Sequence, residues 1–215
     1  LDALAKLRET KGKLHLLGLL SDGGVPNLKL YFLVGLPGDG EEDVREIAKL
    51  TSRIREAWLP AGQKRGRLGS IHLSVNPFVP KPFTPFQWAP MATATELKRK
   101  YRLLRSGIGR IANVSVGFES SRSTLIQGML ARGGRDLAAV ILLLSKEMKL
   151  EAACRQCDVD CGSVLHRQRS KNEVFPWEVV SSGVARDYLL REWQRSRSDQ
   201  ITPRCFESCA RCGIC

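Results

Sequence analysis

The chain has 215 residues, of which 34 are Lys or Arg and 22 are Asp or Glu, and its formal charge is +12. Its hydrophobic share of 43% favours a folded core and argues against a disordered chain. The longest apolar run, residues 137–144, is far shorter than the roughly 20 residues of a membrane-spanning helix, and no basic-then-apolar leader opens the sequence. We therefore expect an intracellular, cytoplasmic protein without a membrane partner.

The chain begins with a predicted helix over residues 1–11, where leucines recur at helical spacing. A segment rich in Gly and Pro, residues 21–26, ends this helix. Residues 28–36 are almost continuously apolar and contain Tyr, Phe and Val, which is typical of a strand covered on both faces. Gly and Pro residues follow directly and end the strand.

A helix is expected between this strand and a second one. Four carboxylates within residues 39–43 precede apolar residues at helical spacing, and negative charge is favourable at a helix N-terminus because it opposes the positive end of the dipole. The helix should run to about Trp58, and residues 71–75 should form the second strand. His72, in the middle of that strand, is interpreted as a core residue. Four prolines within residues 77–85 exclude regular pairing beyond it.

The remainder of the chain is predicted to be mainly helical. Thr93 or Thr95 can cap a helix, a further apolar segment covers residues 108–118, and one or two more helices should follow. Residues 151–199 are polar, with a helix expected around residues 186–195, and they are interpreted as an accessory region.

The two predicted strand exits form a candidate ligand site. Parallel strands joined by a helix place their carboxyl ends at the same edge of a sheet, which is the active-site edge of α/β barrels. Glycine lets the backbone approach a ligand and proline fixes the turn, although the same residues can serve only as turn formers. The candidate residues are Gly35, Leu36, Pro37, Gly38, Val75, Asn76, Pro77 and Phe78.

These exits also carry a resemblance to a known family. Residues 29–39 and 74–88 resemble the later barrel strands of radical S-adenosylmethionine (SAM) proteins, in particular the group with an N-terminal cobalamin-binding domain. Residues 130–135, residues 175–178 and the C-terminal cysteines follow in that group's order. The resemblance covers most of residues 28–215.

The resemblance implies a fold and an organisation. The fold would be α/β, the C-terminal part of a partial TIM-type radical SAM barrel with a helical extension and a Cys-rich tail. Residues 1–90 would hold the last strands and helices of the barrel, residues 91–150 the extension, residues 151–199 the accessory region and residues 200–215 a metal-binding tail.

The resemblance also implies a function. In the complete enzyme a 4Fe-4S cluster would cleave SAM to a 5′-deoxyadenosyl radical, with cobalamin as a further cofactor, and the candidate strand-exit residues would contact the SAM adenosine. The family's C-x3-C-x2-C triplet belongs upstream of the first strand exit and is not found there. We therefore expect a C-terminal fragment that is inactive alone and depends on N-terminal barrel and cobalamin domains, or on a partner chain.

The C-terminal cysteines predict a metal centre. Cys205, Cys209 and Cys212 repeat the C-x3-C-x2-C spacing, but they lie within the last eleven residues, too late for following strands to enclose a SAM cluster. Cys215 completes a set of four thiolates that suits either zinc or a second Fe-S centre. The alternative is a loose tail with free thiols.

The cysteine count bears on disulfides as well. Seven cysteines leave one unpaired, and an intracellular compartment keeps thiols reduced, so the sequence argues against a disulfide framework. Cys154, Cys157 and Cys161 are closely spaced, but we interpret them as outside any metal site.

A second functional class remains open. Lys and Arg cluster at residues 98–105 and again at 167–171, a charge pattern that would attract a phosphate-rich partner. The alternative to the enzyme is thus a basic, zinc-stapled RNA-binding module. These side chains could equally coat the solvent faces of helices, because no aromatic-interleaved recognition motif accompanies them.

Overall fold

The computed structural model describes residues 19–20, 22–198 and 200–214. The helix predicted over residues 1–11 lies outside the described residues, as does Cys215. The chain divides into two compact units, of which unit 1 runs to Phe78 and resumes over Thr93–Glu119. Unit 2 consists of Val79–Ala92 and the chain from Ser120 onward.

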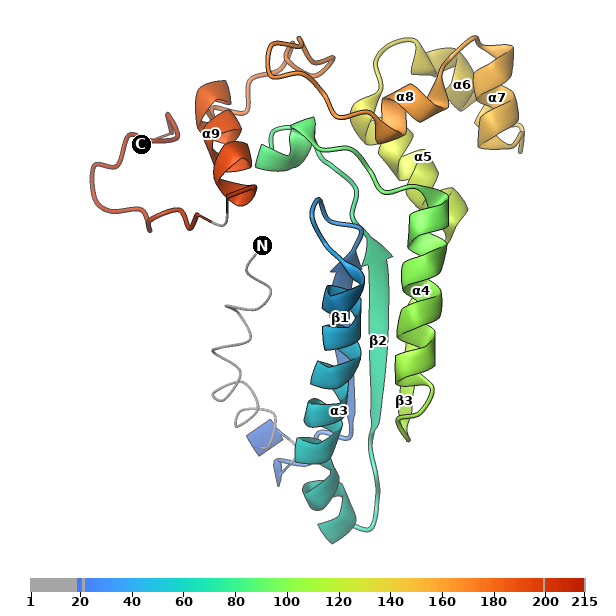
Figure 1. The fold of residues 1–215 in the computed structure, drawn as a ribbon, viewed down its shortest axis with the longest axis vertical. Coiled ribbons are helices and arrows are strands. Elements are labelled where there is room, and N and C mark those ends of the chain that lie inside the picture. The colour runs from blue at the N-terminus through green and yellow to red at the C-terminus, as the bar shows by residue number, and fades with distance from the viewer. Residues whose placement is uncertain (1–18, 21, 199, 215) are drawn as a thin grey trace. The chain divides into compact units, whose positions relative to one another are not determined.

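Unit 1 is a parallel sheet with two connecting helices (Figure 1). Its strands are β1 (Asn27–Val34), β2 (Ser70–Pro77) and β3 (Val114–Phe118), in the order β1-β2-β3. Helix α3 (Glu41–Lys64) connects β1 to β2, and helix α4 (Ala94–Ile108) precedes β3. The predicted strands at 28–36 and 71–75 and a helix between them are thereby confirmed, but α3 continues through Pro60 to Lys64, beyond its predicted end near Trp58.

Both helices cover the same face of the sheet. Right-handed crossovers place successive helices on one face when strands are added in one direction. Alternate residues of β2, Ile71, Leu73 and Val75, are buried on this face at 1%, 0% and 0% exposure. Trp58 of α3 and Leu97 of α4 are buried with them, so the core of unit 1 lies between the helices and the sheet.

The opposite face of the sheet is open in the described part of unit 1. Tyr31 and Leu33 of β1 are 68% and 54% exposed, and Lys29 is exposed beside them. The prediction of a strand covered on both faces is therefore wrong for β1. The prediction failed because Tyr31 and Leu33 make the segment continuously apolar in the sequence. Side chains of a strand alternate between its two faces, so Tyr31 and Leu33 lie on the same face as Lys29.

The predicted partial TIM-type barrel is also wrong. The described residues form an open three-stranded sheet in which β1 and β3 are the edges, and the chain continues after β3 into helices. Strand–helix–strand units occur in open and closed sheets alike. The residues at a strand exit report the local turn and carry no information on how many strands the sheet contains.

Unit 2 contains short helices. They are the 3-10 helix η1 (Pro85–Trp88), then α5 (Ser121–Arg132), α6 (Leu137–Leu144), α7 (Leu150–Gln156), α8 (Cys161–His166) and α9 (Arg186–Ser196). The helix expected around residues 186–195 is confirmed as α9. Helices α5 to α8 enclose a core that includes Met91, Met129 and Leu165. Within the described ranges, no helix combines the length and apolar character needed to cross a bilayer.

A disulfide links α7 to α8, contrary to the expectation from the cysteine count. It joins Cys154 and Cys161, whose Cα atoms are 6.2 Å apart. Cys154 is 2% exposed and belongs to the core of unit 2. Counting cysteines says nothing about which pair the fold brings within bonding distance, and here two consecutive short helices do so. Among the described cysteines, Cys157, Cys205, Cys209 and Cys212 are free.

Candidate ligand site at the carboxyl edge of the sheet

The two predicted strand exits lie next to each other. In the parallel register Leu33 pairs with Asn76 and Val34 pairs with Pro77. The Phe78 N–H then donates to the Val34 carbonyl at 2.8 Å, beyond the end of the ladder. The turn that starts at Gly35 therefore begins beside the segment that leaves β2.

The turn after β1 is held by the side chain of Asp39. Gly35 and Gly38 have φ values of 81° and 89°, in the left-handed region where glycine is favoured. The Gly35 N–H donates to Asp39 Oδ2 at 2.7 Å, and the Asp39 N–H donates to the Leu36 carbonyl at 3.0 Å. The loop is thus closed by hydrogen bonds at both ends.

Helix α4 supplies a cation, Lys100, that holds this loop through Asp39. Lys100 Nζ lies 2.5 Å from Asp39 Oδ1 and donates to the Asp39 carbonyl at 3.0 Å. Sequence reasoning treated Asp39 only as a helix-start carboxylate and did not select Lys100. Nothing local could have shown this pair, because the two residues are 61 positions apart.

The third strand ends at the same edge. The Glu119 N–H donates to the Val75 carbonyl at 3.2 Å, directly after Phe118, which pairs with Val75. The Tyr101 ring of α4 lies 4.3 Å from the Phe118 ring, measured between centroids. Burial, with a smaller effect from the Glu119 charge, raises the pKa of Tyr101 to about 12. Glu119 therefore places a carboxylate at this edge that sequence reasoning missed.

The open face of the sheet brings polar side chains up to this edge. The register aligns Lys29 with His72 and His72 with Ser115 across the three strands. His72 Nδ1 is 2.9 Å from Ser115 Oγ, and His72 is exposed. Its interpretation as a core residue is therefore wrong. Asn76, one of the predicted site residues, lies on this same face at the carboxyl end of β2.

The three described tail cysteines, Cys205, Cys209 and Cys212, are not placed to hold one metal ion together. Cys205 is exposed, Cys209 is 2% exposed and Cys212 is half-buried. Arg211 Nε donates to Cys209 Sγ at 3.1 Å, and this guanidinium lowers the pKa of the Cys209 thiol. In the part of the chain that the structure describes, no three His, Cys, Asp or Glu side chains are placed to hold one ion.

Comparisons with known proteins give one relative of unassigned activity. An uncharacterized protein of Methanocaldococcus jannaschii is 32% identical over 118 residues, which cover 54% of this chain and 23% of that protein. The chain thus spans less than a quarter of the length of this curated relative. No protein-family model matches the sequence, and no solved structure matches it.

Proposed function

We propose that this chain supplies part of the SAM-binding edge of a radical SAM enzyme and corresponds to the C-terminal part of such an enzyme. The observation that carries the proposal is the adjacency of two strand exits at one edge of a parallel sheet. They are the exits that the sequence resemblance assigns to adenosine contact, Gly35–Gly38 and Val75–Phe78. Ligands of open α/β sheets also bind at the carboxyl ends of strands.

The residues at this edge suit a nucleoside-type cofactor. Gly38 is exposed, so its backbone is accessible without a side chain in front of it. Phe78 offers an apolar ring, while Asn76 offers an amide that can both donate and accept. In this proposal the backbone of the two exits holds the adenine, and the Asp39–Lys100 pair keeps the first exit in its turn.

SAM, bound together with a reduced iron–sulfur cluster, would supply the radical chemistry. The contribution of this chain is to bind and orient. Its loop is closed by its own hydrogen bonds before any ligand arrives, so little conformational entropy remains to be lost on binding.

Calorimetric titration of the 215-residue chain with SAM tests the proposal. We expect saturable binding that a Gly38→Val substitution weakens at least tenfold, because a β-branched residue is strained at a φ of 89°. Gly66→Val is the matched control. Gly66 also has a positive φ, 67°, but it lies after α3, away from the carboxyl edge. Absence of SAM binding, or equal weakening by both substitutions, would contradict the proposal.

The Cys-rich tail is proposed to bind zinc or a second Fe-S centre. Because the described thiols do not converge, binding would have to draw the tail together, as it does in small metal-ordered domains. Elemental analysis after anaerobic purification should give one metal centre per chain. Replacing Cys205 and Cys212 by Ser should remove it, whereas Cys157→Ser on the α7 side should not. If the wild type, the variant with Cys205 and Cys212 replaced, and Cys157→Ser are all free of metal, the centre is excluded.

RNA binding is the second candidate function, favoured by the exposed basic side chains of α4. Lys98, Arg102 and Arg105 are exposed on one helix of a chain with a formal charge of +12. Fluorescence anisotropy with a labelled single-stranded RNA should then show affinity that falls steeply with salt. Replacing Lys98 and Arg102 by Glu should weaken it, and affinity unchanged by either salt or substitution would exclude this function.

A further inference from the structure

Unit 2 contains a cavity of about 210 Å³ that the proposed function does not use. It lies between the η1 segment and the start of α9. Aromatic residues, an amide and an ion pair line it, namely Phe83, Gln87, Trp177, Glu178, Arg186 and Leu189. All of them belong to unit 2.

The amide of Gln87 is fixed in orientation at this cavity. Its Oε1 accepts hydrogen bonds from the Phe83 N–H at 3.1 Å and from Trp177 Nε1 at 3.0 Å. Two donors on one atom identify that atom as the oxygen. The amide nitrogen must then point the other way, and its position is not interchangeable with that of the oxygen.

The amide nitrogen of Gln87 has no hydrogen-bond partner among the described residues. Gln87 is only 4% exposed and lines the cavity. Because Gln87 lines the cavity and its amide nitrogen is not among the fully buried polar atoms, its N–H groups are open to the cavity. An acceptor atom placed in the cavity can accept from them, so the amide nitrogen marks where a ligand oxygen belongs.

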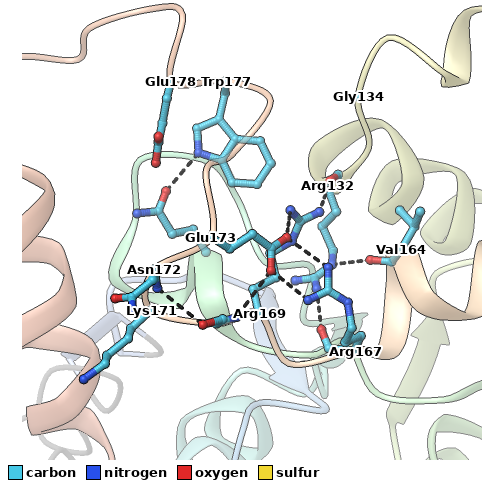
Figure 2. A network of polar contacts seen from close by, with 12 residues as sticks. Arg132, Gly134, Val164, Arg167, Arg169, Lys171, Asn172, Glu173, Trp177 and Glu178 are labelled. Carbon is cyan, nitrogen blue, oxygen red and sulfur yellow. Dashed lines mark hydrogen bonds and ion pairs between the residues drawn. The ribbon is translucent and has the colours of Figure 1, made fainter.

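The frame around this donor is rigid. Phe83 has a φ of 57°, which is unusual for a residue with a side chain, and its N–H is tied to Gln87. The Trp177 ring packs 4.8 Å from the Phe175 ring between centroids. The Arg169 guanidinium lies 5.2 Å from the Trp177 centroid, and both of these side chains are drawn in Figure 2. Trp177 therefore presents an immobilised aromatic wall to the cavity.

The charged side chains at and near the cavity are paired with one another. Arg167 and Arg169 converge on the single carboxylate of Glu173, at distances between 2.7 and 2.9 Å (Figure 2). Arg186 forms an ion pair with Glu178 at the cavity wall, so the acidic residue that lines the cavity is neutralised. The cavity lining thus holds one cation and one carboxylate, paired with each other, and a ligand carboxylate is favoured by the charge-assisted hydrogen bond that it accepts from the Gln87 amide.

We infer that this cavity binds a small aromatic carboxylate. One carboxylate oxygen accepts from Gln87 Nε2, and the ring packs between Trp177 and the apolar side chain of Leu189. A cation of the same size has no acceptor at the Gln87 end, because the only oxygen of that amide already accepts from Phe83 and Trp177. The inference does not depend on SAM binding at the sheet edge, which lies in unit 1.

NMR titration of the isotope-labelled chain tests the inference with three ligands that share one ring: benzoate, benzamide and benzylamine. Benzoate should shift the side-chain amide signals of Gln87 and the indole N–H of Trp177 in a saturable manner. Benzamide, a neutral acceptor, should bind at least threefold more weakly than benzoate. Benzylamine should leave these signals in place. Absence of saturable shifts with benzoate, or benzylamine binding as tightly as benzoate, would overturn the inference.

The substitution Gln87→Glu tests the role of the amide N–H donor alone. The carboxylate can still accept from Phe83 and Trp177, but it presents an oxygen where the amide presents N–H groups. Benzoate affinity should fall at least tenfold. Gln194→Glu, which adds the same charge on an exposed position of α9, should leave it unchanged. Benzoate affinity that stays at the wild-type value in a folded Gln87→Glu protein would overturn the inference.

A second variant keeps the test valid if Gln87→Glu does not fold. Val184 also lines the cavity and is only half-buried, so Val184→Phe should fill the cavity without disturbing Gln87. Benzoate binding should then fall at least tenfold. Binding at the wild-type affinity would place benzoate elsewhere and would overturn the inference.

Discussion

Lys100 Nζ lies 2.5 Å from a carboxylate oxygen of Asp39, and only 6% and 14% of the two side chains are exposed. This pair joins α4 to the turn that ends β1. The same carboxylate accepts the Gly35 N–H at 2.7 Å. One buried ion pair therefore connects the packing of a helix to the shape of the candidate ligand loop.

Replacing Lys100 by Met should destabilise the chain by about 3 kcal/mol, because it leaves the Asp39 charge buried without its partner. Urea unfolding at neutral pH measures the change. Arg99→Met is the matched control. Arg99 pairs with Glu41 at 3.0 Å, but the two side chains are 58% and 37% exposed, so its loss should be below about 1 kcal/mol. Equal effects of the two substitutions would contradict a special role for the buried pair.

Tyr101→Phe should be neutral or stabilising by up to about 1 kcal/mol at pH 7. The Tyr101 hydroxyl is buried and makes no hydrogen bond among the described residues, and removing an unsatisfied buried group eliminates its desolvation cost. Urea midpoints of the two proteins measure this. A large loss of stability would contradict the assignment of an unsatisfied hydroxyl.

The same variant should change the alkaline pH dependence of stability. The folded-state pKa of Tyr101 is about 12, raised by burial from 10.0, so the unfolded state loses its proton first. The contribution of Tyr101 to the free energy of unfolding is then fully present below pH 10 and is lost as the pH rises from 10 to 12. The wild-type urea midpoint should fall further from pH 9 to pH 11 than that of Tyr101→Phe. Parallel declines would contradict the assignment.

The sequence was sufficient to predict the local elements of unit 1. Apolar runs predicted β1 and β2, and the acidic cluster predicted the start of α3, where Asp43 accepts the Gly40 N–H at 2.7 Å. Each of these signals is contained within a few residues. They also predicted that the two strand exits would be neighbours, since a strand–helix–strand unit of this length forms a parallel pair.

The sequence was insufficient wherever the outcome depended on distant residues. The number of strands was overestimated because a strand exit looks alike in an open sheet and in a barrel. Lys100 was missed because its partner lies 61 residues away. The orientation of Gln87 depends on donors from Phe83 and Trp177, and the latter is 90 positions distant. Such pairings exist only after the chain has folded.

Arg132 gives a further prediction, for unit 2. It is 0% exposed, and it donates from three separate nitrogens to the carbonyl oxygens of Ala89, Val164 and Arg167, of which the last two are labelled in Figure 2. A lysine has one nitrogen at the end of its chain and cannot reach three separated carbonyls. Arg132→Lys should therefore destabilise the chain by about 3 kcal/mol or more. The urea midpoint, followed by tryptophan fluorescence, measures the loss.

Arg135→Lys serves as the control for that prediction, because Arg135 is exposed in the loop that follows α5. Its effect should stay within about 0.5 kcal/mol. An Arg132→Lys protein as stable as Arg135→Lys would show that the three carbonyls are satisfied without the guanidinium.

Reduction of the Cys154–Cys161 disulfide should lower stability by about 2–3 kcal/mol, because the bond closes a short loop and restricts the unfolded chain. The two cysteines are seven positions apart. Dithiothreitol should therefore lower the urea midpoint of the wild type and of Cys157→Ser by the same amount. Cys161→Ser should begin at the lower midpoint and should not respond. If dithiothreitol lowers the midpoint of Cys161→Ser as well, the stabilising bond is not the one between these two residues.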